Sequence, residues 1–448
     1  MVGRYARHGS FRTLLEMRHT GVGTIVSNVS TLSATAAVTS GLGFVFWSLA
    51  ARTAPPAAVG LAAAAISAST LLATISMLGL GTLLIGEVAG GRDRDPSVLT
   101  TSVVVVGTTS TLLGLGFAIL GPNFIKDLGP LNLGLPFVAL FVITCATTAV
   151  GLLTDQLMVG LLRAELQLAR NSLFSLAKLG ALALASPLLV NDKGLLVFGV
   201  WPLGNLISMV ALGAYVARRP IGIGLAPPKL QLVRRMGRAA LSHHALNLSA
   251  QATGQILPVL VTVMLSTTAN AYFYTSWMIA TVAFIPQNAL SVTLYALGAR
   301  EPTALRSRAR LTVLLGFVEG LAAIGLVELL APWILTAFGK TYAVEASLSL
   351  RIMVLAVIPS VIKAHFIALS RITGRVRAGG VTMALSACVE LGAAAAGGYL
   401  GGLPGLSVGW VLGICLEAIW MFPTIWRVIG PTRTVASASL VTQAGLHR

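Results

Sequence analysis

Long apolar stretches recur along the whole chain and are separated by short polar breaks. A bilayer core about 30 Å thick needs about 20 apolar residues in an α-helix, and the stretches reach about that length. The breaks carry turn signals, such as Ala54-Pro55-Pro56 and Gly401-Gly402-Leu403-Pro404. The pattern predicts twelve membrane-spanning helices, near residues 22–50, 57–86, 98–120, 131–154, 171–190, 194–217, 239–265, 269–298, 309–338, 346–369, 378–400 and 404–426.

Composition supports lipid rather than water as the solvent of this chain. Hydrophobic residues make up 56% of the 448 residues and charged residues only 10%, which is too little charge for the surface of a soluble protein of this size. The formal net charge is +17, but the basic residues lie between the apolar spans. We therefore expect an all-α polytopic membrane protein and no nucleic-acid partner.

The positions of Lys and Arg predict the orientation. Most of the 31 Lys and Arg residues fall in connections on the same side as both termini, whereas the opposite side holds only Arg52, Lys126, Lys193 and Lys340. Such a bias places the basic side and both termini in the cytoplasm of a cell-membrane protein. The expected organisation is a basic N-terminal segment at 1–21, six-helix lobes at 22–217 and 239–428, a basic linker at 218–238 and a cytoplasmic tail at 429–448.

The second six spans faintly repeat the first. Gly60 and Ala271 open the second span of their halves, and Lys178-Leu179-Gly180-Ala181 matches Glu390-Leu391-Gly392-Ala393. These and two further landmarks are separated by a nearly constant 211–213 positions. A constant offset indicates a parallel duplication. Transporters built from such repeats bind their substrates at the interface between the two copies.

Several short motifs resemble one family. The run from Phe46-Trp47-Ser48 through Pro55-Pro56 to Leu78-Gly79-Leu80-Gly81 resembles the first helix pair of the polysaccharide branch of the multidrug/oligosaccharidyl-lipid/polysaccharide exporter superfamily. Asp155-Gln156-Leu157 with Arg170-Asn171 is similar to that family's link between its fourth and fifth helices. The resemblance covers most of residues 22–428. It implies the export or flipping of a lipid-linked saccharide by alternating access.

Polar residues on the first helix of each half are candidates for lining a cavity. In the seventh span four polar residues follow one another at i+4 steps, so they stay within about 120° of one face. A stripe of this kind would offer hydrogen bonds to sugar hydroxyls; alternatively it would bind neighbouring helices together. The candidate cavity residues are Asn28, Thr31 and Thr35 in the first span and His243, Asn247, Gln251 and Gln255 in the seventh.

Charged residues within or beside spans are costly in lipid and are therefore functional candidates. Cations near the interface would suit a pyrophosphate-linked substrate, whereas a buried carboxylate that changes protonation would suit coupling to a cation. Paired charges that lock helices together, or side chains that reach to the interface, are the structural alternative. The candidates are Arg52, Lys178, Glu319, Arg351, Lys363 and Glu390.

The sequence contains no phosphate-binding loop, nucleophile motif or zinc-ligand spacing. We therefore expect no enzyme, catalytic residue, metal or cofactor. The favoured function is a flippase for a lipid-linked oligosaccharide, a precursor of an envelope polysaccharide. Its partners would be that substrate, membrane lipids, a coupling cation and the proteins of polysaccharide assembly. A cation-coupled exporter of small amphipathic compounds is the first alternative, and a polytopic glycosyltransferase or ligase is the second.

Overall fold

The computed structural model describes residues 38–89, 97–124, 134–161, 163–187, 193–218, 226–229, 231, 238–300 and 302–430. Within these residues the chain is α-helical and contains no β-strand, which confirms the predicted all-α class. The candidate residues Asn28, Thr31 and Thr35 lie outside the described residues, as do segment 1–21, most of the linker 218–238 and the tail from 431 onward.

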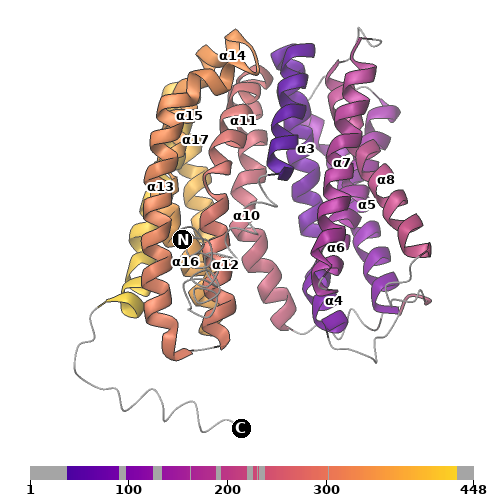
Figure 1. The fold of residues 1–448 in the computed structure, drawn as a ribbon. Coiled ribbons are helices and arrows are strands. Elements are labelled where there is room, and N and C mark those ends of the chain that lie inside the picture. The colour runs from indigo at the N-terminus through magenta and orange to yellow at the C-terminus, as the bar shows by residue number, and fades with distance from the viewer. Residues whose placement is uncertain are drawn as a thin grey trace, which may run out of the picture.

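The first half of the chain forms a helix at residues 38–53 and six labelled helices (Figure 1). A turn at residues 77–79 separates the first two labelled helices, and Leu78 and Gly79 adopt positive φ there. The predicted span 57–86 is therefore interrupted in its second part. The labelled helices are α3 (Pro56–Ser76), α4 (Leu80–Ala89), α5 (Ser97–Phe124), α6 (Leu135–Gly160), α7 (Ala164–Ala185) and α8 (Lys193–Arg218).

The second half begins with a long helix and contains two sharply bent helix pairs. The pairs α11–α12 and α15–α16 are each bent by 45° at a short break. A 3₁₀ turn at Pro302–Ala304 precedes α13. The helices are α10 (Arg238–Met264), α11 (Thr267–Val282), α12 (Ile285–Arg300), α13 (Leu305–Thr336), α14 (Lys340–Glu345), α15 (Ser347–Val354), α16 (Val357–Ile372) and α17 (Val376–Ile429).

Helix α17 is a hairpin of two arms rather than one long helix. Gly401 and Gly402 depart from helical geometry, and Gly402 has a φ of 60° and a ψ of −143°, a conformation that favours glycine. The arms, 376–400 and 403–429, lie side by side, because a Cβ on Gly397 would meet the carbonyl oxygen of Gly405 at 2.1 Å and one on Gly413 would meet the Cα of Glu390 at 2.9 Å. The break coincides with the predicted turn.

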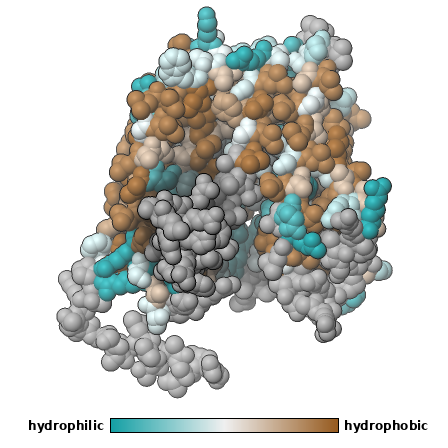
Figure 2. Space-filling view, in the orientation of Figure 1, coloured by the Kyte–Doolittle hydropathy of each residue, from teal (hydrophilic) through white to brown (hydrophobic). Residues whose placement is uncertain are grey.

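Large apolar side chains cover the outside of the helices. Leu329 and Trp333 are each 75% exposed and Ile419 is 71% exposed, and Figure 2 shows a broad apolar surface across the middle of the molecule with hydrophilic residues toward its ends. Lipid contact explains this arrangement. Among the described residues, six helices, or eight with the bent pairs, are long and apolar enough to cross a membrane. Each predicted span overlaps a helix, but the total of twelve crossings stays a prediction.

The two halves of the chain stand next to each other. Figure 1 shows the helices of the first half, from indigo to magenta, beside those of the second half, from red to yellow. Helix α3 packs against both α10 and α11, so these three helices form much of the contact between the halves. We call this contact surface the seam.

Candidate functional site

The seam is closest where two residues equivalent in the sequence repeat meet. A Cβ on Gly60 of α3 would stand 1.8 Å from the carbonyl oxygen of Thr267 and 2.8 Å from the backbone nitrogen of Ala271 in α11. The Asn270 side chain donates a hydrogen bond of 2.7 Å to the Gly60 carbonyl. Gly60 and Ala271 are the pair that open the second span of each half. Glycine is required here because only a backbone without a side chain allows this approach.

Arg52 ties the halves together at one end of the seam. Its Nε donates to the carbonyl oxygen of Ala337 at 2.6 Å, and its Nη2 lies 3.4 Å from that of Thr336. These carbonyls belong to the C-terminal end of α13, where a cation is favoured by the helix dipole. The charge bias of the sequence predicts that this end faces away from the cytoplasm. Arg52 is therefore a contact between the halves in this structure.

We expect Arg52→Gln to favour conformations in which this end of the seam is open. A net hydrogen-bond contribution of about 0.5–1.5 kcal/mol corresponds to a shift in the equilibrium of about two- to tenfold. The rate at which a membrane-impermeant maleimide modifies a single cysteine placed at Thr267 measures this opening. Lys340→Gln is the matched control, because Lys340 is an exposed cation at the same end. Equal modification rates in the two variants would contradict the role assigned to Arg52.

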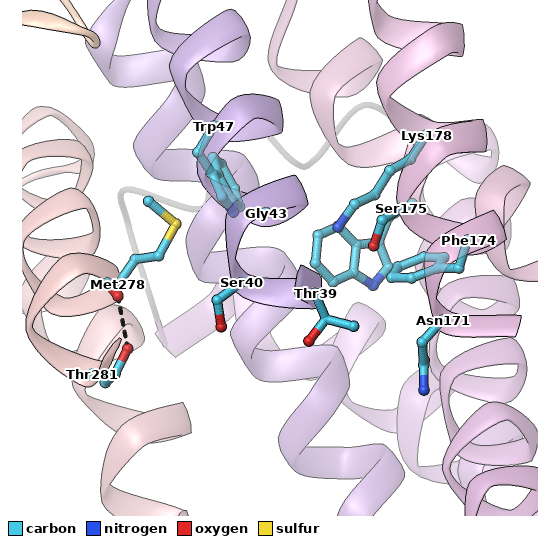
Figure 3. Close-up of a pocket in the computed structure, with 11 residues that line it drawn as sticks. Thr39, Ser40, Gly43, Trp47, Asn171, Phe174, Ser175, Lys178, Met278 and Thr281 are labelled. Atoms are coloured by element: carbon cyan, nitrogen blue, oxygen red, sulfur yellow. Dashed lines mark hydrogen bonds between the residues drawn. The ribbon is translucent and has the colours of Figure 1, made fainter. Parts of the chain in front are cut away.

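A cavity of about 410 Å³ lies in the seam (Figure 3). Most of its wall belongs to the first half, and two residues of α11 complete it from the second half. Within the described part of the chain, the wall contains one cation and no acidic residue. We call this cavity the seam pocket; its residues are Thr39, Ser40, Gly43, Trp47, Asn171, Phe174, Ser175, Lys178, Trp201, Met278 and Thr281.

Lys178 is the charged group of the seam pocket, and it is only 3% exposed. Its Nζ lies 3.7 Å from the centroid of the Trp201 ring, 4.4 Å from that of Phe174 and 4.7 Å from that of Phe46. Aromatic faces attract a cation through their quadrupoles, and a site screened from water strengthens that attraction. Figure 3 shows the Lys178 side chain reaching toward the aromatic rings on the α7 side of the pocket. The cage stabilises the ammonium without neutralising its charge.

Motif residues from α6 and α7 fix the first turns of α7. Arg170 forms two hydrogen bonds with Asp155, of 3.0 and 2.9 Å, and its Nη2 donates to the Asn171 side chain at 2.7 Å. Arg170 is 5% exposed, and a paired, hydrogen-bonded geometry is what a buried charge needs. Asn171 also lines the seam pocket. The Asp155-Arg170 pair thus orients the turn of α7 that carries the pocket residues.

The predicted stripe on α10 does not line the seam pocket. Asn247 instead accepts a hydrogen bond of 2.6 Å from Nη2 of Arg371 on α16. This bond joins two neighbouring helices, which is the alternative to cavity lining for that residue. Gln251 is exposed, and His243 and Gln255 are half-buried. The structure therefore brings the seventh span to the seam through its contact with α3, while cavity lining by its four polar residues stays a prediction.

The remaining charged candidates fall into two kinds of environment. Arg351 pairs with Glu328 at 3.6 Å with both side chains about 40% exposed. Glu319 lies beside Gln287, and its Oε2 receives no hydrogen bond from the residues that the structure describes. Lys363 and Glu390 belong to a buried cluster with Glu417. The sequence places Glu417 within a predicted span as well, but it does not reveal that Glu417 meets Lys363 and Glu390, because one helix does not show which side chains its neighbours present. Among the described residues, no group of three or more His, Cys, Asp or Glu is placed to hold a metal ion.

Comparison with known proteins defines the fold but not the substrate. No protein-family model and no curated protein sequence matches the chain. Solved structures do match. An inward-facing multidrug resistance MATE family transporter of the MOP superfamily is 18% identical, with a TM-score of 0.62 over 87% of this chain and 94% of that one. An outward-facing structure of such a transporter is 15% identical, with a TM-score of 0.61 over 93% and 98%.

A third structure shares the fold and is described differently. It is a MOP superfamily transporter from Pyrococcus furiosus Vc1, for which a reverse polarity of the binding pocket is said to suggest a different function. It is 17% identical, with a TM-score of 0.57 over 93% of this chain and 98% of that one. The chain therefore has the fold of these transporters over nearly its whole length, at identities that establish the fold alone.

Proposed function

We propose that this protein is a membrane transporter that moves a lipid-linked oligosaccharide, with an anionic phosphate or pyrophosphate linkage, across the cytoplasmic membrane by alternating access. The observation that carries the proposal is the seam pocket, in which Lys178 is the only charged residue among the described residues of the wall. A buried cation that has no acid beside it in the pocket wall favours an anionic ligand and disfavours a cationic one. The role is transport, and we assign no catalytic residue.

The other wall residues suit the remainder of such a substrate. Trp47 and Trp201 offer flat apolar faces to sugar rings, and the hydroxyl groups of Thr39, Ser40 and Ser175 can donate and accept hydrogen bonds. A polar headgroup cannot cross the hydrocarbon core without such partners, because each unsatisfied polar group costs several kcal/mol in lipid. The pocket would supply these partners between the two leaflets.

The fold supports an alternation between two states. Structures with this fold are described in inward-facing and outward-facing conformations. In this chain the helix at residues 38–53 and α11, from opposite halves, both contribute to the pocket wall. Rocking of the halves about the seam would therefore open the pocket to one side of the membrane at a time. Twelve spans in two six-helix lobes, with both termini in the cytoplasm, are part of this proposal.

A series of lipids that differ only in the headgroup tests the charge preference. We expect a polyprenyl-pyrophosphate saccharide to raise the thermal unfolding midpoint of the purified protein in nanodiscs, because a ligand that binds only the folded state stabilises it. A polyprenyl saccharide with an uncharged linkage should bind about tenfold more weakly or worse, given about 1.5–3 kcal/mol for a hydrogen bond to a charged group. Equal stabilisation by both lipids would contradict the proposal.

A cation-coupled exporter of small amphipathic compounds is the second candidate function. Two observations favour it: a compared structure is a multidrug resistance transporter, and the second half buries Glu390 and Glu417. In the same assay this candidate predicts stabilisation by cationic amphipathic dyes and none by the pyrophosphate lipid. That outcome would contradict the proposed flippase function and support the exporter function.

A further inference from the structure

Each half of the chain buries one ionisable residue against a tryptophan of the next helix. In the first half, Lys178 of α7 lies against Trp201 of α8, with Nζ 3.7 Å from the ring centroid. In the second half, Glu390 of the first α17 arm accepts a hydrogen bond of 2.9 Å from Nε1 of Trp410 in the second arm. Lys178 and Glu390 are the repeat-equivalent pair found in the sequence. The two halves therefore carry equivalent sites of opposite charge.

Glycine positions confirm that the two sites have the same architecture. Trp201 is followed three residues later by Gly204, where a Cβ would lie 3.2 Å from the Cβ of Lys178. Trp410 is followed three residues later by Gly413, where a Cβ would lie 2.9 Å from the Cα of Glu390. In both halves a glycine thus allows the last helix to approach the ionisable residue closely. The site in the second half therefore has the same arrangement of tryptophan, glycine and ionisable residue as the site in the first half.

The site in the second half contains more than one charged group. Lys363 of α16 forms ion pairs with Glu390 and, at 3.1 Å, with Oε2 of Glu417. The side chains of Glu390 and Glu417 are 3% and 1% exposed, and that of Lys363 is 15% exposed. We call Lys363, Glu390 and Glu417 the acidic triad. With all three groups ionised the triad would carry a net charge of −1 in the interior, which is costly without a further positive charge.

The hydrogen-bond donors are shared unequally between the two acids. Glu390 receives Lys363 at Oε1 and Trp410 at Oε2, so both oxygens of its carboxylate are satisfied. Apart from the ion pair of Oε2 with Lys363, neither oxygen of Glu417 receives a hydrogen bond from the described residues. The two acids lie close together, because Nζ of Lys363 contacts both carboxyl groups. Two carboxylates cannot bond to each other without a proton, since both are acceptors only.

We propose that the acidic triad is a proton-binding site, in which one exchangeable proton resides on Glu417 and is shared with Glu390. The proton makes the triad neutral, because the ammonium of Lys363 balances the carboxylate of Glu390. It also supplies the missing donor between the two carboxyl groups. Two acids in contact that share one proton are a recurring solution to like-charge repulsion. The inference does not rest on the substrate proposed above.

The surroundings favour a proton over a metal ion. Nζ of Lys363 occupies the space between the two carboxyl groups, so a metal ion would have to displace it. Among the described residues, the charged groups that interact with Glu417 are Lys363 on α16 and Glu390 on the first arm of α17. Helices α10, α13 and α15 also pack against α17 but add no charge to these interactions.

Infrared difference spectroscopy of the full chain in ether-linked lipid, which lacks ester carbonyls, tests the proposal. We expect the C=O band of a protonated carboxylic acid in the wild type, and we expect it to disappear as the pH is raised. Glu417→Gln and Glu390→Gln should each abolish this band, because the remaining acid then balances Lys363 as a carboxylate. Lys363→Met should about double it, since two protons are then needed for neutrality. Glu328→Gln, a half-exposed acid outside the triad, is the control and should leave it unchanged.

Three outcomes would overturn the proposal. The first is a wild-type band that persists unchanged in Glu417→Gln. The second is a Lys363→Met spectrum with no increase, a measurement that does not depend on the folding of the glutamine variants. The third is loss of the wild-type band on addition of sodium chloride at constant pH, which would identify a site for a metal cation. None of these measurements requires transport activity, so failure here is distinguishable from failure of the proposed function.

Discussion

Lys178→Met is expected to weaken binding of a polyprenyl-pyrophosphate saccharide by about tenfold to a hundredfold. Of the wall residues that the structure describes, Lys178 alone is charged, and a hydrogen bond to a charged group contributes about 1.5–3 kcal/mol. Methionine keeps the length and the apolar stem of the side chain, so it removes the charge with little change in packing. Titration of the lipid into the protein in nanodiscs measures the dissociation constant directly.

The stability of the ligand-free variant separates binding from folding. The aromatic cage holds Lys178, and the described wall residues include no acid, so replacing the cation by an apolar residue should leave the unfolding midpoint unchanged or raise it. Lys193→Met is the matched control: its Nζ donates to the Thr53 carbonyl at 2.7 Å, outside the pocket. We expect wild-type affinity in that variant. Equal affinities in Lys178→Met and Lys193→Met would remove Lys178 from the binding site.

Gly60→Ala is expected to shift the two halves away from the arrangement seen in this structure. The added Cβ would stand 1.8 Å from the Thr267 carbonyl oxygen and 2.8 Å from the Ala271 nitrogen, both backbone atoms that cannot rotate away. Overpacking of this kind costs about 1–3 kcal/mol, which corresponds to a change of about five- to 150-fold in the population of the close-packed seam. We expect the end of the seam at Arg52 to open and transport to fall.

Pulsed electron paramagnetic resonance measures the distance between spin labels at Thr53 and Lys340, which lie in opposite halves of the chain. The labels are introduced in a background with Cys145, Cys388 and Cys415 replaced. The Gly60→Ala distribution should move to longer distances than that of the parent. Gly180→Ala serves as control, because a Cβ at Gly180 meets no atom within 4 Å. A Gly60→Ala distribution that coincides with the Gly180→Ala distribution would show that the close approach of α3 and α11 does not hold the halves together.

The helices of the fold were predictable because lipid imposes a simple rule on the sequence. Every backbone polar group must be hydrogen-bonded within the helix. The apolar runs on either side of Gly401-Gly402 therefore predict two helices, and the glycines predict the turn between them. The repeat offset also identified Gly60 and Ala271 as equivalent positions. The offset did not reveal that these two residues contact each other, because equivalence in a sequence does not specify how the copies pack.

The site was less predictable, for reasons that concern side-chain partners. Lys178 was chosen for its charge within a span, but its cage of Phe46, Phe174 and Trp201 comes from three helices, and aromatic residues in a membrane helix resemble ordinary packing residues. Helical periodicity placed Asn247 on a polar face but did not indicate that Arg371 lies opposite it. Periodicity defines a face of a helix; only tertiary structure defines what that face meets.

Translocation of a fluorescent polyprenyl-pyrophosphate saccharide in reconstituted vesicles tests the central claim most directly. A membrane-impermeant quencher reports how much of the lipid has reached the outer leaflet. The account predicts translocation well above that of protein-free vesicles by the wild type, and at least about tenfold slower translocation by Lys178→Met. Wild-type vesicles that translocate the lipid no faster than protein-free vesicles, while extruding a cationic dye, would contradict it.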